Sequence, residues 1–169
     1  MIEITPLHIV FGVSAVFVLG GGLGVVTSRN LVHAALWLVL SLFGVAGLFV
    51  LLEAPFLAAV QVLVYIGAIA VLITITIMVT QRVMGARDAL VSQWPLALVV
   101  AALLVATLGF VVIANFTDGT AAADVPADSI AALGRALVSL GGFALPFEVA
   151  SVLLLAAMIG SIVVARERE

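Results

Sequence analysis

The chain has 169 residues, of which 66% are hydrophobic and 9% are charged, and its mean hydropathy is +1.46. A soluble domain needs a substantially polar surface, so this composition predicts an integral membrane protein. The absence of cysteine excludes disulfides, thiolate metal sites and cysteine-ligated iron–sulfur clusters in this chain, and a net charge of −3 without a basic cluster excludes nucleic acid as a partner.

Five apolar segments are long enough to cross a bilayer, because about 20 helical residues span a hydrocarbon core about 30 Å thick. We therefore expect an all-α integral membrane protein that forms a single domain over residues 1–169. The expected spans are 7–27, 31–52, 56–80, 95–114 and 147–165, and the expected long loop is 115–146. The first span lacks the basic start of a signal peptide, so we expect it to be retained.

Small residues and helix-capping residues mark how the first spans are joined. The first span is rich in glycine, at positions 12, 20, 21, 22 and 24, which predicts close packing against a neighbouring helix. Asn30 can cap the second span by accepting from its free amide groups. Glu53-Ala54-Pro55 forms a very short turn, so we expect the second and third spans to be an antiparallel hairpin.

The arginines predict the orientation of the chain. Five of the six fall in the first loop, the third loop and the C-terminal tail, which alternate crossing places on one side: Arg29, Arg82, Arg87, Arg166 and Arg168. Because cationic loops stay in the cytoplasm, we expect the N-terminus outside, in the periplasm, and the C-terminus in the cytoplasm.

Charged side chains are absent from the midpoints of all the expected spans, so the chain alone lacks a continuous proton relay. In the third span, Gln61, Tyr65 and Thr76 recur at steps that place them on one face of a regular helix. Gln61 and Tyr65 could hydrogen-bond across helices, the more usual role of polar side chains in membranes, or line a proton path. Gly67 gives the same helix a place for close approach or distortion.

The remaining polar residues have simpler interpretations. We expect Thr74, Thr76 and Thr80 to bond back to carbonyls one turn earlier in their own helix. Pro146 and Glu148 are expected in the first turn of the last span, where a carboxylate is favoured by the helix dipole. His33 lies one turn from Trp37 near an interface, and a lone histidine does not predict a metal site.

Three passages resemble one family. The segment FLAAVQVLVYIGAIAVL, residues 56–72, resembles the third-helix signature of subunit J of the proton-pumping NADH:quinone oxidoreductase, respiratory complex I, a relative of the mitochondrial ND-six subunit. RNLVHAA at 29–35 is similar to that family's first-loop motif, and PFEVASVLLL at 146–155 is similar to the start of its last helix.

The resemblance implies five membrane helices in a bacterial inner membrane, beside subunits A, H and K and the antiporter-like subunits. It implies a π-bulge around Tyr65 to Gly67 whose formation or loss gates a connection between quinone reduction and proton pumping. Tyr65, Gly67, Gln61 and Thr76 are then the gate or proton-path candidates, and Glu148, Pro146, Arg29 and His33 the structural or interface candidates. NADH, FMN, iron–sulfur clusters and quinone are implied in other subunits, with no cofactor or metal in this chain.

Three alternatives stay open at this point. The same subunit could serve a related complex that takes electrons from ferredoxin or another donor. A stand-alone channel or carrier would transport by itself, although the lack of buried charges argues against it. A purely structural assembly subunit would tolerate changes at Tyr65 or Gly67, or lose the whole complex.

Overall fold

The computed structural model describes residues 5–80, 94–116 and 128–166, and these form helices and turns. The helices are α1 (Pro6–Thr27), α2 (Leu31–Leu51), α3 (Pro55–Val60), η1 (Gln61–Ala70), α4 (Val71–Thr80), α5 (Trp94–Phe116), α6 (Ser129–Val138) and α7 (Ala144–Ala165). Because α3, η1 and α4 form one continuous span, the described residues contain five helices long and apolar enough to cross a membrane, as predicted. The third loop with Arg82 and Arg87, and residues 117–127 of the expected long loop, lie outside the described residues.

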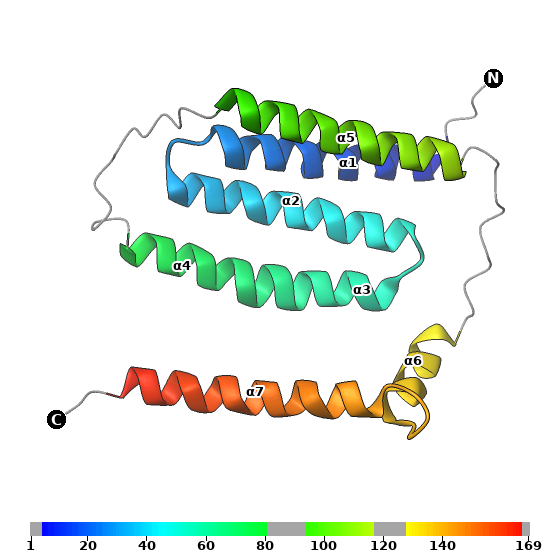
Figure 1. Ribbon diagram of the computed structural model, residues 1–169, viewed down its shortest axis with the longest axis vertical. Coiled ribbons are helices and arrows are strands. Elements are labelled where there is room, and N and C mark those ends of the chain that lie inside the picture. The colour runs from blue at the N-terminus through cyan, green and yellow to red at the C-terminus, as the bar shows by residue number, and fades with distance from the viewer. Residues whose placement is uncertain (1–4, 81–93, 117–127, 167–169) are drawn as a thin grey trace. The chain divides into compact units, whose positions relative to one another are not determined.

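The chain divides into two compact units, Met1–Ala122 and Ala123–Glu169. In the first unit, α1 packs on α2, and α2 packs in turn on the span formed by α3, η1 and α4 (Figure 1). This confirms the predicted hairpin between the second and third spans. In the second unit, α6 packs against α7.

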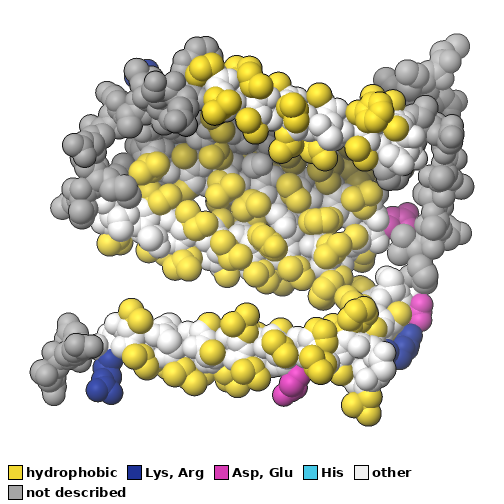
Figure 2. Space-filling view, in the orientation of Figure 1, with side chains coloured by type: hydrophobic (Ala, Val, Ile, Leu, Met, Phe, Trp, Pro, Cys, Tyr) yellow, Lys and Arg dark blue, Asp and Glu magenta, His cyan; other side chains and the backbone are white. Residues whose placement is uncertain are grey.

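Small side chains form the core of the first unit. Among the residues that the structure describes, the buried hydrophobic ones are all alanines, at positions 35, 46, 58 and 70, while large hydrophobic side chains remain exposed on every span. Figure 2 shows this apolar surface, where yellow side chains cover the lengths of the helices. Small residues let helix backbones approach closely in membranes, where burial of large apolar groups gives little advantage over lipid.

Glycines on α1 and α2 permit this close approach. A Cβ atom added at Gly21 would lie 2.7 Å from the backbone nitrogen of Ser41, and Gly24 lies against the indole ring of Trp37. On α2, a Cβ atom at Gly44 would lie 2.8 Å from the backbone oxygen of Ser14. The predicted packing of the glycine-rich first span is confirmed, although Gly12 and other glycines of α1 have no such neighbour.

Both ends of α2 are closed by local hydrogen bonds. The side chain of Asn30 accepts a 2.9 Å hydrogen bond from the backbone N–H of Val32, as predicted. At the other end, Glu53 has a left-handed backbone, with φ of 53°, and the amide of Ala54 donates to the carbonyl of Phe49 over 3.0 Å. This arrangement reverses the chain in a few residues and usually places glycine where Glu53 stands.

The N-cap hydrogen bond of Asn30 is expected to contribute to the stability of the chain. We expect Asn30→Ala to lower the free energy of unfolding by about 1 kcal/mol, because the acceptor for an otherwise free helix amide is lost. Thermal unfolding of the purified chain in detergent would measure the loss. Asn30→Asp keeps the acceptor and is the matched control, so equal losses in the two variants would contradict the assigned cap.

The last span begins earlier than predicted. α7 starts at Ala144, so Pro146 lies in its first turn as expected, but Glu148 is its fifth residue and lies beyond that turn. A proline is accepted this far into a helix start because the first four amides have no partner in the helix. The prediction that Glu148 lies in the first turn of the last span is therefore wrong, and Glu148 is exposed on the second turn.

Candidate functional site

The third span changes its helical register at its centre. Residues Gln61–Ala70 form a π-helix of ten residues, flanked by α-helix on both sides. This agrees with the π-bulge expected around Tyr65 to Gly67, although the π segment is longer than a single bulge. π-helices are rare and usually short, and they occur frequently at functional sites. We take η1 as the candidate functional site.

Gln61 attaches the start of η1 to α2. Its side chain is 6% exposed, and its Nε2 atom donates a hydrogen bond of 3.3 Å to the backbone oxygen of Leu42. Ala58, one turn earlier, is also buried. An interhelical hydrogen bond of this kind satisfies an amide that would be costly to leave unpaired in a membrane. The interhelical role that the sequence suggested for Gln61 is therefore present.

Tyr65 and Thr76, the other polar gate candidates, are exposed, unlike Gln61. Tyr65 is 47% exposed, and Thr76 is exposed with its hydroxyl donating to the carbonyl of Leu72 over 2.8 Å. The single face predicted for Gln61, Tyr65 and Thr76 assumed regular α-helical spacing, and η1 does not keep that spacing. That prediction is wrong because a π register shifts the positions of residues beyond it.

The threonines of α4 satisfy their own hydroxyl groups. Thr74 donates to the carbonyl of Ala70 and Thr80 to that of Thr76, each over 2.8 Å. These are the predicted bonds to the carbonyl one turn earlier. Among the described residues, these hydroxyls therefore donate within their own helix and not to a neighbouring one.

Gly67 lies one π-helical step beyond Val62. A Cβ atom added there would lie 3.3 Å from the backbone oxygen of Val62, five residues earlier. That separation in sequence is the hydrogen-bonding step of a π-helix, whereas an α-helix pairs residues four apart. A side chain at position 67 would therefore crowd the carbonyl of Val62 in the π form.

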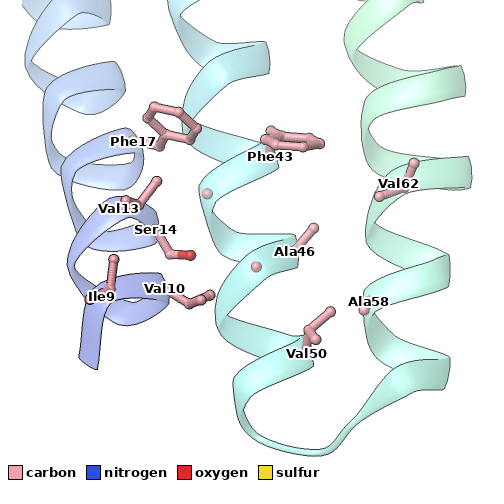
Figure 3. Close-up of a pocket in the computed structure, with 12 residues that line it drawn as sticks. Ile9, Val10, Val13, Ser14, Phe17, Phe43, Ala46, Val50, Ala58 and Val62 are labelled. Atoms are coloured by element: carbon pink, nitrogen blue, oxygen red, sulfur yellow. The ribbon is translucent and has the colours of Figure 1, made fainter. Parts of the chain in front are cut away.

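An apolar cavity of about 430 Å³ opens between α1, α2 and the start of the third span. Figure 3 shows Phe17 and Phe43 at one end and Ala58 and Val50 toward the other. Ser14 is its polar residue, 6% exposed, with a hydroxyl that lies against Gly47. Sequence reasoning missed this cavity, because no motif marks a gap left between small residues on three helices.

The remaining candidates lie outside η1. Arg29 and His33 are exposed at the turn between α1 and α2, and Glu148 is exposed on α7. Among the described residues, no group of three or more histidine, aspartate or glutamate side chains is arranged to hold a metal ion. The structure therefore brings Gln61, Tyr65 and Gly67 into one π segment and leaves the interface candidates apart from it.

Residues 21–164 match the family model described as NADH-ubiquinone/plastoquinone oxidoreductase chain 6. The chain belongs to this family. F(420)H(2) dehydrogenase subunit J of Methanosarcina mazei is 40% identical over 160 residues, covering 93% of this chain and 89% of that protein. NADH-quinone oxidoreductase subunit J of Rhodobacter capsulatus is 39% identical, covering 90% and 78%. NAD(P)H-quinone oxidoreductase chain 6 of Leptolyngbya boryana is 37% identical, covering 92% and 78%.

Membership of this family makes the chain a subunit of an oxidoreductase complex, and its partners are other subunits of that complex. The matched region includes η1 and most of the described helices. The large hydrophobic side chains exposed on the isolated chain are consistent with such a role, because a membrane subunit covers its helices with lipid and with neighbouring chains.

Proposed function

We propose that this chain is the subunit of a proton-translocating NADH:quinone oxidoreductase that couples quinone reduction to proton pumping, and that its third span is the gate. The observation that carries the proposal is η1, ten residues of π-helix inside a membrane span. In this proposal the chain lies in a bacterial inner membrane, N-terminus outside, beside subunits A, H and K, with the antiporter-like subunits further along the membrane.

The packing of the span supports a division into a fixed part and a turning part. Ala58 and Gln61 are buried on the N-terminal side and Ala70 at the last residue of η1, whereas α4 buries none of its side chains. One residue of change in register rotates everything beyond it by about 100°, because an α-helix has 3.6 residues per turn. Conversion of η1 to α-helix would therefore re-aim the side chains of α4 while α3 stays on α2.

The gate would act on water and on side chains of neighbouring subunits. No span of this chain has an aspartate, glutamate, lysine or arginine near its midpoint, so the titratable groups of the proton path belong to partners in this proposal. Tyr65 is exposed on η1 and Thr76 on α4, where they can meet water or those groups. Rotation of α4 would move Thr76 relative to Tyr65 and so connect or interrupt a hydrated path.

The electron donor is set by other subunits in this proposal. The three relatives are named for F(420)H(2), NADH and NAD(P)H, yet their identities to this chain differ by only a few per cent. The proposal takes NADH, as in the name of the Rhodobacter capsulatus protein, and ferredoxin or another donor is the alternative. NADH, FMN, the iron–sulfur clusters and quinone would bind to those other subunits.

A Gly67→Ala variant tests the gate. The added methyl group would crowd the carbonyl of Val62 in the π form, and alanine favours α-helix over glycine by about 1 kcal/mol. This difference corresponds to about a fivefold shift of the equilibrium toward the α form. We expect the assembled complex to translocate fewer protons per electron, measured as proton uptake and donor oxidation in the same membrane vesicles.

Gly20→Ala is the matched control, because a Cβ atom at Gly20 meets nothing within 4 Å. Normal pumping and normal quinone reduction in assembled Gly67→Ala and Tyr65→Phe complexes would reject the gate. Loss of the whole complex in both variants would instead favour a purely structural subunit. Proton transport by the purified chain alone in vesicles would favour the stand-alone carrier.

A further inference from the structure

The short helix α6 has two chemically distinct faces. Ile130, Leu133 and Leu137 are spaced at three and four residues, which places them on one side of the helix. Asp128 and Arg135 lie on the opposite side, where Nη2 of Arg135 is 3.0 Å from a carboxylate oxygen of Asp128. Both charged side chains are largely exposed. A ten-residue helix with this pattern is amphipathic.

A tight turn fixes α6 at the start of α7. The amide of Phe143, which precedes α7, donates to the carbonyl of Ala136 on α6 over 2.9 Å, and the amide of Gly142 donates to Ser139 over 3.0 Å. A side chain at position 142 would collide with the carbonyl of Ala136, so the turn requires glycine there. In Figure 1, α6 (yellow) lies across the beginning of α7 (orange) and does not extend it.

This geometry turns the apolar face of α6 toward the membrane. α7 is the helix packed against α6 within the described part of their unit, and Ala136 and Leu137 are half-buried there. Because α7 is long enough to span the bilayer, its first residue lies near one membrane surface. A helix lying across that end, with its apolar side toward the span, lies in the plane of that surface.

We propose that α6 is an interfacial helix that binds the lipid surface at the membrane face where α7 begins. Ile130 is 55% exposed on its apolar side, and Leu140 and Phe143 in the adjoining turn are also exposed. Such helices bury their apolar face about 5–10 Å into the boundary between headgroups and acyl chains. The ion pair between Asp128 and Arg135 stays on the aqueous side, and the surface so formed needs no particular lipid charge. This inference does not depend on the gate.

Spin labelling of the assembled complex tests the proposal. The chain has no cysteine, so complex treated in the same way but lacking an introduced cysteine corrects for label on other subunits. Labels at Ile130→Cys and Ala132→Cys would be compared in vesicles of phosphatidylcholine, by their collisions with oxygen, which enters lipid, and with a water-soluble nickel chelate. Ala132 lies on the side of Asp128 and Arg135 and leaves their ion pair intact.

We expect the oxygen-to-nickel collision ratio to be several-fold higher at position 130 than at position 132. Leu133→Cys provides a second apolar position should the first variant assemble poorly. High nickel accessibility at positions 130 and 133, equal to that at 132, would place α6 in water and reject the proposal. Low accessibility to both reagents at positions 130 and 133 would show a protein partner on this face, which also rejects a lipid-bound helix.

Discussion

A Gly44→Val variant is expected to lose the packing of α1 on α2. A Cβ atom at position 44 would lie 2.8 Å from the backbone oxygen of Ser14 and from the backbone nitrogen of Val18. These are backbone atoms of a neighbouring helix, so no side chain can rotate away to make room. Forcing extra atoms into a packed interior commonly costs 1–3 kcal/mol, and we expect a loss of about 3 kcal/mol in the free energy of unfolding.

The loss would be measured by denaturant or thermal unfolding of the purified chain in detergent. Gly12→Val, also on a membrane helix, is the matched control, because nothing lies within 4 Å of a Cβ atom there. The isolated chain is the right material, since it separates contacts within the chain from contacts with other subunits. Equal stability of the two variants would mean that α1 and α2 do not approach as closely as the structure has them.

The glycine-rich composition of the first span predicted close packing without identifying the contacts. Gly21 and Gly24 face α2, whereas Gly20 and Gly22 do not. On α2, Gly44 faces the backbone of α1 and Gly47 faces the side chain of Ser14. A membrane helix is apolar on all sides, so its sequence carries no amphipathic pattern to show which side meets protein. The number of spans is easier to predict, because length and hydropathy alone decide it.

The length of the π segment also could not be predicted from the sequence. Resemblance to a known third-helix signature led to the expected bulge near Tyr65, but the ten-residue length of η1 did not follow from the residues. No local side-chain pattern distinguishes a π from an α register, because both use backbone N–H and C=O groups and differ only in which residues these groups join. The predicted single polar face was wrong for this reason, since it assumed one spacing from Gln61 to Thr76.

The start of α7 was misplaced for a different reason. Pro146 was expected to lie at the helix start, but its missing amide is also tolerated at the third helical position, and α7 begins at Ala144. The amphipathic helix α6 lies within residues 115–146, which were expected to form a long loop. Its orientation depends on the turn at Gly142 and Phe143, which sequence periodicity does not describe.

A Gln61→Ala variant is expected to release the third span from α2. The substitution removes the hydrogen bond from Nε2 to the carbonyl of Leu42 and leaves a gap where a side chain is 6% exposed. Loss of a buried hydrogen bond contributes about 1 kcal/mol, and the gap adds to it, so we expect a total loss of about 2–3 kcal/mol. Unfolding of the purified chain in detergent would measure this loss.

Gln61→Leu separates the two contributions, because leucine fills much of the space but cannot donate a hydrogen bond. We expect it to lose about 1 kcal/mol, since the carbonyl of Leu42 still belongs to the hydrogen-bonded backbone of α2. Leu63→Ala, at a side chain 71% exposed on the same π-helix, should change the stability of the isolated chain little. If Gln61→Ala were no less stable than Leu63→Ala, Gln61 would not anchor the span.

The hydrogen bond between Gln61 and α2 also determines which end of the third span would rotate when η1 changes register. In the proposed gate, the hydrogen bond from Gln61 holds the α3 end of the span against α2, so a switch of η1 between π and α forms would be taken up by α4. Without this hydrogen bond, the α3 end would be free to turn instead, and the side chains of α4 would not need to move relative to neighbouring subunits. An assembled Gln61→Leu complex is therefore expected to reduce quinone while translocating fewer protons per electron. Unchanged coupling in that variant would mean that rotation about η1 does not depend on this contact.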